Sequence, residues 1–131
     1  LGDIVFANLA ALAKLEGILH PAVGREIGRR ISGSARSVVV LEAIKLLESG
    51  LDVDCNAIWV VTSNPGKRRR RLITRDGLSV DDALHRVEIQ LPQEEKVSRA
   101  DVVIDNNGNL SQTRVQVQRA WGKIGRWNKR R

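Results

Sequence analysis

The sequence predicts an α/β protein built around a parallel sheet, because two patterns alternate along it. Three short apolar runs rich in β-branched residues show no alternation with polar residues, which is typical of strands buried on both faces. These runs lie near 37–43, 57–62 and 101–105. Segments with the helical spacing of apolar residues lie between and around them. Strands that alternate with helices favour a layered α/β fold with right-handed crossovers.

Composition narrows the class of protein. The chain has 131 residues, of which 42% are hydrophobic, and a net charge of +7. A chain of this size can form one domain with a core, and its charge favours anionic partners such as nucleotides, phosphorylated metabolites or nucleic acid. The longest apolar runs are far shorter than the ~20 residues of a membrane helix, so no membrane partner is expected. The single Cys55 fits a reducing, cytoplasmic location.

The amino-terminal part is predicted to be helical. Apolar spacing indicates helix over 1–19, in one piece or in two, with Asn8 as the N-cap where two pieces would meet. We expect a break at His20-Pro21, because a residue before proline avoids the helical region. A second helix is then expected from Pro21 to about Ile31.

Cap and turn signals divide the segment after the second apolar run. Pro65 can open a helix whose exposed face is nearly all arginine, and Asp76-Gly77 is a turn. Ser79 is expected to cap the next helix, with Asp82 three residues later as in a capping box. Further along, Pro92 opens a short helix, and a turn precedes a final helix over 110–121.

A basic run is the strongest candidate for binding chemistry. Lys67 to Arg71 together with Arg75 place five arginines and one lysine within nine positions. At helical spacing Arg71 and Arg75 share a face, and two guanidinium groups on one face can grip a polyphosphate. A solvated cationic face or a patch for nucleic acid explains the same run. The glycine-rich pattern G-x-x-x-x-G-K-[ST] that cradles phosphates does not occur in the 131 residues.

The stretch from Arg71 to Asn106 resembles the carboxy-terminal part of dephospho-CoA kinases. The matching positions are Arg71, Arg75-Asp76-Gly77-Leu78-Ser79, Arg86, Gln90, Glu95-Lys96 and Ala100-Asp101 with Ile104-Asp105-Asn106. In the amino-terminal half, Phe6-Ala7-Asn8 and Leu19-His20-Pro21 resemble the family's segment before and at its His-Pro break. The resemblance covers essentially all of residues 1–121.

The resemblance implies an incomplete three-layer P-loop-kinase-like fold. We expect one partial kinase domain that lacks an amino-terminal β-loop-α-β unit, and with it the phosphate loop and the catalytic base, so that the chain alone is inactive. Its expected parts are a helical CoA-side region (1–36), core strands (37–63), an ATP lid (64–99), the last strand and helix (100–121) and a basic tail (122–131).

The same resemblance implies roles for the lid arginines. Arg71 is the expected catalytic residue that holds the phosphates of ATP, with Arg68 and Arg75 beside it in the lid. The family usually has glutamine at the position of Arg68, which either adds charge to the site or faces water. Arg75 acts as a second clamp or forms a salt bridge with Asp76.

Further site residues are expected at the sheet end and in the CoA-side region. Asp105 and Asn106 follow the last strand, where open α/β sheets place ligands, although a turn that ends the strand is an alternative role. His20, Pro21 and Glu48 are implied on the CoA side, with Glu42 competing with Glu48 for that role. No residue of this chain is expected to be a metal ligand.

The resemblance implies a transferase that moves the γ-phosphoryl group of ATP, with Mg, to the 3'-hydroxyl of dephospho-CoA in coenzyme A biosynthesis. ATP and dephospho-CoA are then the partners. One alternative is a basic nucleic-acid-binding module, which the 3% aromatic content and the lack of a known binding motif do not favour. Another is a fragment of a related nucleoside-monophosphate kinase, which should lack the ending Ala100-Asp101-x-x-Ile104-Asp105-Asn106.

Overall fold

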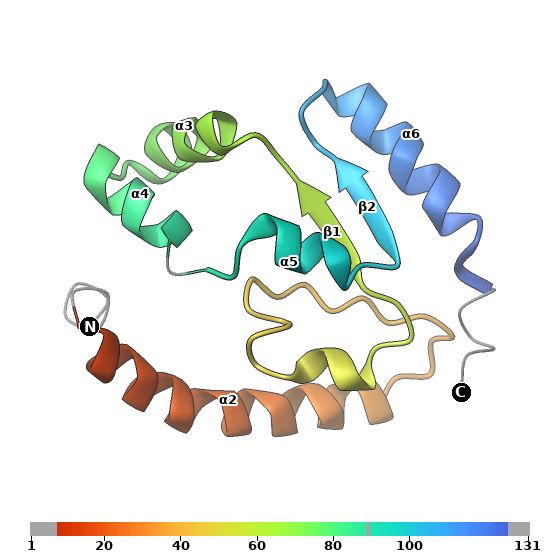
Figure 1. Cartoon of the computed structure of the whole chain (residues 1–131). Coiled ribbons are helices and arrows are strands. Elements are labelled where there is room, and N and C mark those ends of the chain that lie inside the picture. Colours follow the sequence, from red (N-terminus) through yellow and green to blue (C-terminus); the bar gives the residue numbers. More distant parts are fainter. Residues whose placement is uncertain (1–7, 89, 126–131) are drawn as a thin grey trace. The chain divides into compact units, whose positions relative to one another are not determined.

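The computed structural model describes residues 8–88 and 90–125, in two compact units, Leu1–Leu51 and Asp52–Arg131. We describe each unit separately, with the labels of Figure 1. The elements are α2 (Leu9–Ser32), a 3-10 turn η1 (Leu51–Asp54), β1 (Trp59–Thr62), α3 (Pro65–Asp76), α4 (Val80–Glu88), α5 (Gln93–Ser98), β2 (Val102–Asp105) and α6 (Leu110–Trp121).

One long helix, α2, dominates the first unit. The Asn8 side chain accepts hydrogen bonds from the main-chain N–H groups of Ala10 (3.0 Å) and Ala11 (3.1 Å), which confirms the predicted N-cap. The helix ends where the N–H of Gly33 donates to the carbonyl of Arg29 at 3.1 Å. No residue of α2 is buried within the described part of the chain.

The predicted break at His20-Pro21 is wrong, because α2 continues through both residues. Proline has no N–H group, so it removes one intrahelical bond, the one that would reach the carbonyl of Gly17. The turns on either side keep their own bonds and hold the 24-residue helix together. The aversion of a residue before proline to the helical region is a tendency that longer helices can override.

The predicted strand at 37–43 is also wrong, because this segment forms neither strand nor helix. All its residues except the half-buried Leu41 are exposed, with Val40 75% accessible to solvent. A strand exists only through hydrogen bonds to a neighbouring strand, and no described segment pairs with this one. The apolar run therefore has strand propensity without the partner that would turn it into a strand.

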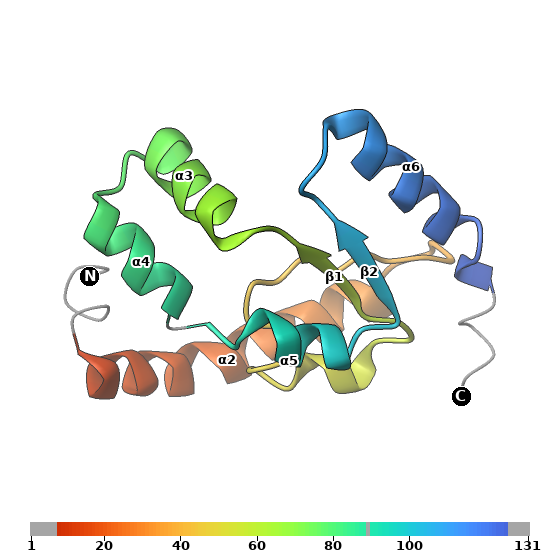
Figure 2. The ribbon, with the colours of Figure 1, turned by 45° about the horizontal axis from the view of Figure 1, so that its top comes forward.

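The second unit contains a two-stranded parallel sheet, with β1 and β2 side by side in Figures 1 and 2. This confirms the α/β class and the two strands predicted near 57–62 and 101–105, each slightly shorter than expected. Trp59 pairs with Val102 and Thr62 with Asp105, so the carboxyl ends of both strands reach the same side of the unit.

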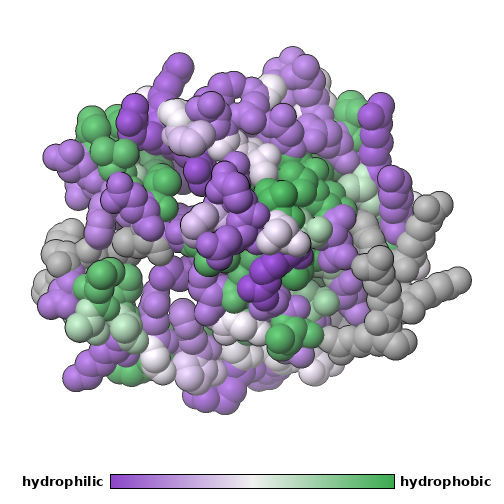
Figure 3. Space-filling view, viewed as in Figure 1, coloured by the Kyte–Doolittle hydropathy of each residue, from purple (hydrophilic) through white to green (hydrophobic). Residues whose placement is uncertain are grey.

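Each face of the sheet is only half covered. Paired residues of parallel strands share a face, so Val60 lies beside Val103 and Val61 beside Ile104. Val60 and Ile104 are buried, but their neighbours Val103 and Val61 are 43% and 61% exposed. Helix α5 packs mainly on β1 and α6 mainly on β2. Hydrophobic side chains accordingly reach the surface over the strands in Figure 3.

Side-chain amides close parts of the sheet edges. Gln116 of α6 accepts a hydrogen bond from the N–H of Asp105 at 2.9 Å and donates one to its carbonyl at 2.8 Å. These are the two main-chain groups that a third strand would use, so the carboxamide takes the place of a peptide group. Directly after β1, the side chain of Gln93 accepts a bond from the N–H of Ser63 at 3.1 Å.

Helices α3 and α4 pack against each other and lie next to one another in Figure 2. Asn64 caps α3 by accepting from the N–H of Gly66 at 2.9 Å, and Gly77 ends it with a left-handed φ of 66° that favours glycine. The Ser79 hydroxyl accepts from the N–H of Asp82 at 3.1 Å, so the predicted cap of α4 is confirmed. The caps at Asn64 and Ser79 and the turn at Gly77 therefore define where α3 begins and ends and where α4 begins.

The buried position of Ile104 predicts a large effect of its truncation. Ile104 is only 2% exposed, so Ile104→Ala should lower the free energy of unfolding by about 2–5 kcal/mol, the usual cost of such a deletion. The control Val61→Ala shortens its paired neighbour on the same face, which is 61% exposed, and should cost about 0.5 kcal/mol. Urea unfolding followed by circular dichroism measures both, and equal losses would contradict this account of the core.

Candidate functional site

The carboxyl ends of β1 and β2 carry the polar groups of the candidate site. β1 leads through Ser63 into the capping residue Asn64 of α3, and β2 leads into Asn106 and Asn107. The N–H of Asn106 continues the sheet ladder by donating to the carbonyl of Thr62 at 2.9 Å. Ligands of open α/β sheets bind outside the carboxyl ends of the strands, which is where these residues lie.

Helix α3 divides the basic run between two sides. At about 100° of rotation per residue, Lys67, Arg71, Arg75 and Arg68 fall within an arc of about 100°. Arg69 lies roughly opposite that arc, and with Arg70 it lines a shallow groove of about 490 Å³ together with Ile73. The helix thus separates cations that are continuous in the sequence.

Two cations of the first side contact the loop after β2. The Arg71 guanidinium donates to the carbonyl of Asn106 at 3.3 Å, and the Lys67 ammonium donates to the carbonyl of Asn107. Asn107 also accepts, through its side chain, the N–H of Asn64 at 2.7 Å. Asn64, Lys67 and Arg71 are spaced three and four residues apart, so the loop runs along one face of α3.

The other two cations on that side differ in their surroundings. Arg75 forms two hydrogen bonds with its neighbour Asp76, at 2.7 and 3.1 Å, as in the second of its two expected roles. That hydrogen bond lowers the pKa of Asp76 and raises the pKa of Arg75. Arg68 is half-buried, and its Nε is enclosed without an acceptor within the described part of the chain. An enclosed guanidinium N–H without an acceptor favours a ligand that supplies one.

Asp105 and Asn106 shape the loop through hydrogen bonds of their own. The Asp105 carboxylate accepts from the N–H of Asn107 at 2.8 Å, which is the turn-forming role weighed for it from the sequence. The Asn106 side chain accepts from the hydroxyl of Thr113 in α6 at 3.0 Å. The carbonyl of Asn106 is therefore held where Arg71 meets it.

Sequence reasoning named Lys67 only as a member of the basic run, and it assigned a site role neither to Lys67 nor to Asn107. For Lys67 a signal was available, because it stands four residues before Arg71 and must share its side of a helix. For Asn107 there was none, since its contacts join residues about 40 positions apart. Elsewhere in the segment 64–99, Lys96 donates to the side chain of Gln90 at 3.2 Å.

The residues predicted for the CoA side lie in the first unit. His20 and Pro21 are inside α2, and Glu48 lies in the turn region 44–50, which the Lys45–Glu16 ion pair ties to α2. The role of these three residues on the CoA side stays a prediction.

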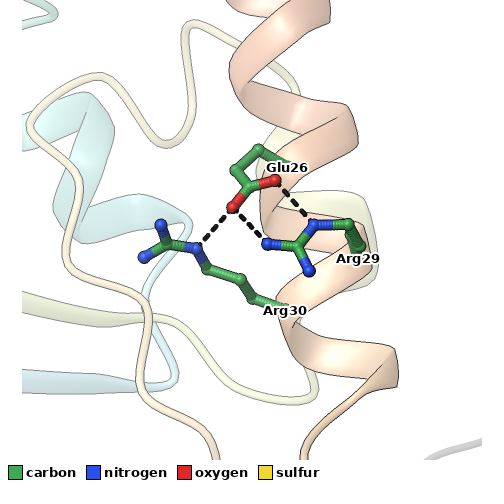
Figure 4. Close-up of polar contacts among 3 residues, drawn as sticks. All are labelled: Glu26, Arg29 and Arg30. Carbon is green, nitrogen blue, oxygen red and sulfur yellow. Dashed lines mark hydrogen bonds and ion pairs between the residues drawn. The ribbon is translucent and has the colours of Figure 1, made fainter.

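An ionic cluster begins at Glu26 of α2, almost two turns beyond His20 (Figure 4). Glu26 accepts hydrogen bonds from Arg29 at 2.8 and 2.7 Å and from Arg30 at 2.7 Å. The hydrogen bonds from Arg29 and then Arg30 lower the pKa of Glu26 to about 2. One carboxylate therefore serves two guanidinium groups, and the cluster keeps a net positive charge.

Within residues 8–88 and 90–125, no three histidine, cysteine or acidic side chains come together as metal ligands would. The helices in that part are also too short or too polar to cross a membrane.

The parallel strands, with a cationic helix at their carboxyl ends, define an α/β protein with a candidate anion-binding site. The family model for dephospho-CoA kinase matches residues 1–112, and the chain belongs to this family. Among curated proteins, a dephospho-CoA kinase of Symbiobacterium thermophilum is 44% identical over 124 residues. One of Carboxydothermus hydrogenoformans is 42% identical over 120 residues. These alignments cover 92% and 89% of this chain.

Two solved structures are also similar to this chain. A Thermus thermophilus protein matches with a TM-score of 0.77 at 30% identity, over 93% of this chain and 64% of that one. The dephospho-CoA kinase of Campylobacter jejuni matches with a TM-score of 0.60 at 27% identity, over 97% and 64%. The chain spans 52% and 58% of the two curated relatives. Family membership supports neither the nucleic-acid-binding module nor the nucleoside-monophosphate kinase.

Asn107 should fix the start of α3. Asn107→Ala removes the acceptor of the Asn64 N–H, and should lower the free energy of unfolding by about 1 kcal/mol, the net worth of one hydrogen bond. Asn107→Asp keeps an acceptor oxygen and should cost less. Urea unfolding measures the two energies, and hydrogen exchange of the Asn64 amide should accelerate only in the alanine variant. Equal exchange in both would rule out this role.

The Glu26 cluster predicts acid sensitivity of α2. Because the folded pKa of Glu26 is depressed to about 2, its contribution to the helix is full above an unfolded pKa of about 4.3 and is lost as the pH falls toward 2. An NMR titration of the Glu26 carboxyl should show its midpoint near pH 2. Replacing both Arg29 and Arg30 by alanine should return it to about 4.3. A midpoint that does not move would show that the two arginines are not its cause.

Proposed function

We propose that the protein to which this chain belongs transfers the γ-phosphoryl group of ATP to the 3'-hydroxyl of dephospho-CoA. In this proposal the segment 64–99 is the lid over ATP and the region 1–36 lies on the CoA side, together with Glu48. The observation that supports it most is the position of Arg71 on α3, beside the main chain of Asn106 at the carboxyl ends of the strands.

Arg71 is the residue that acts on the reacting phosphate. Phosphoryl transfer asks a protein mainly to position two substrates and to stabilise the charge that spreads over the γ-phosphoryl oxygens. A guanidinium group is permanently charged and presents several N–H donors in one plane, so it can bind two of those oxygens together. Arg71 has no carboxylate partner in the described part of the chain, which leaves its charge available.

The other two lid arginines act differently. Arg68 brings an enclosed Nε that has no acceptor among the described residues, and an oxygen of the nucleotide would satisfy it. Arg75 is tied to Asp76 at the end of α3, so it supports the turn into α4 and contributes less charge to the ligand. Asp105 and Asn106 hold the loop that α3 faces and define the floor of the nucleotide site.

On the CoA side, His20, Pro21 and Glu48 are the residues we assign to dephospho-CoA. His20 is half-buried in α2, and the ionic cluster that begins at Glu26 follows it along the helix. The positive charge that remains in that cluster suits the diphosphate of the substrate.

Mg accompanies ATP in the family, but the described residues offer no set of ligands for it. We therefore assign no residue of this chain to the ion. When present with ATP, Mg would neutralise phosphate charge.

An activity assay tests the proposal. The chain is joined to the segment that precedes the matched region in the Symbiobacterium thermophilum relative, and phosphorylation of dephospho-CoA by ATP is followed. Arg71→Ala should lower kcat at least about a hundredfold, because a charge that stabilises the transition state is lost. Arg69→Ala removes the same charge from the opposite side of α3 and should change kcat by no more than about twofold.

Equal activity of the Arg71→Ala enzyme and its parent would remove Arg71 from the mechanism. Failure of the joined protein to phosphorylate dephospho-CoA, while it is folded by circular dichroism and binds ATP, would refute the proposed reaction itself.

A further inference from the structure

Lys67 stands on the same side of α3 as Arg71 and meets the same loop. Its ammonium group donates to the carbonyl of Asn107, and the Arg71 guanidinium donates to the carbonyl of the preceding residue, Asn106. We propose that Lys67 is a second phosphate-binding residue, which with Arg71 forms a two-cation site for a linear di- or triphosphate. This inference deepens the proposed nucleotide site and rests on it.

Lys67 and Arg71 differ from four arginines that are each paired with a nearby carboxylate. Arg29 and Arg30 share the carboxylate of Glu26, Arg75 is paired with Asp76, and Arg99 is paired with Asp52 at 2.5 Å. Among the described residues, Lys67 and Arg71 contact only neutral carbonyl oxygens. Two uncompensated positive charges one helical turn apart attract an anion.

The two carbonyl oxygens are fixed in place by other contacts. The N–H of Asn106 is bonded to Thr62 at 2.9 Å, and the N–H of Asn107 to the Asp105 carboxylate at 2.8 Å. The side chain of Asn106 is held by Thr113 at 3.0 Å. Lys67 and Arg71 therefore hold their charged ends beside the carboxyl ends of the strands, before any ligand is bound.

A polyphosphate can replace the two carbonyl oxygens as acceptor. Hydrogen bonds between a cation and an ionised oxygen are about twice as strong as those to a neutral one. Lys67 and Arg71 are both exposed, so an anion can reach them without opening the core. A linear chain of phosphates can contact both groups at once, whereas a single inorganic phosphate would satisfy one at a time.

The test uses the 131-residue chain and sodium triphosphate, with binding measured by isothermal titration calorimetry. Lys67→Gln should weaken binding about tenfold, the usual effect of losing one hydrogen bond to a charged group. Lys67→Arg should bind within about twofold of the parent, because it keeps the charge. Arg69→Gln is the matched control, since it removes one charge from the opposite side of the same helix, and it should also stay within about twofold.

A second readout reports the site itself. In the parent chain, triphosphate should shift the NMR signals of the Asn107 and Gly108 amides, because these amides share peptide groups with the carbonyls of Asn106 and Asn107 that both cations leave. In Lys67→Gln the shift at Gly108 should be lost while that at Asn107 persists.

Two results would overturn the proposal. One is an equal loss of affinity in Lys67→Gln and Arg69→Gln, because binding would then follow net charge alone. The other is the absence of measurable binding to the parent chain. An effect of Arg71→Gln without any effect of Lys67→Gln would refute the role of Lys67 and leave the proposed kinase function intact.

Discussion

The parallel pairing of β1 with β2 is the constraint on which the candidate site depends. Each strand has only four residues and would not be stable as a strand without its partner. Their pairing brings two loops, at 63–64 and at 106–107, to the same end of the sheet, although about 43 positions separate them in sequence. The hydrogen bond from the Asn64 N–H to Asn107 then joins the loops directly, and α3 starts from that junction. The direction of α3, and so the position of Arg71, follows from the sheet.

Helix formation gives different surroundings to residues that look equivalent in the sequence. The lysine and arginine side chains of the run repel one another, and in an irregular segment their order in sequence would not assign them to different sides. On α3 the same residues divide between the sheet end, where Lys67 and Arg71 meet main-chain carbonyls, and the groove lined by Arg69 and Arg70. Only the first group lies where α/β sheets place their ligands. Local helical periodicity thus decides which cations belong to the candidate site.

Features that depend on neighbouring residues, such as helix caps, could be predicted from the sequence, whereas individual contacts between distant residues could not. The caps at Asn8 and Ser79 depend on groups within three residues, so their side-chain chemistry identified them correctly. The run at 37–43 has the composition of a strand, but a strand needs a neighbour that composition does not reveal. Pro21 does not end α2 as predicted, because the loss of one hydrogen bond leaves a helix of 24 residues intact. The resemblance pointed to Arg71 and Asn106, whereas Asn107 emerged only when the fold brought distant residues together.

The carboxamide of Gln116 has a mechanical consequence for α6. Its two hydrogen bonds to Asp105 require the side chain to face both the N–H and the carbonyl of a single residue of β2. A slide of α6 by one residue, about 1.5 Å along its axis, would misalign both bonds together. The helix is therefore pinned lengthwise to the strand, and Thr113, one turn earlier, holds Asn106 at a fixed depth. Shifting or twisting α6 would consequently be transmitted to the loop that meets α3.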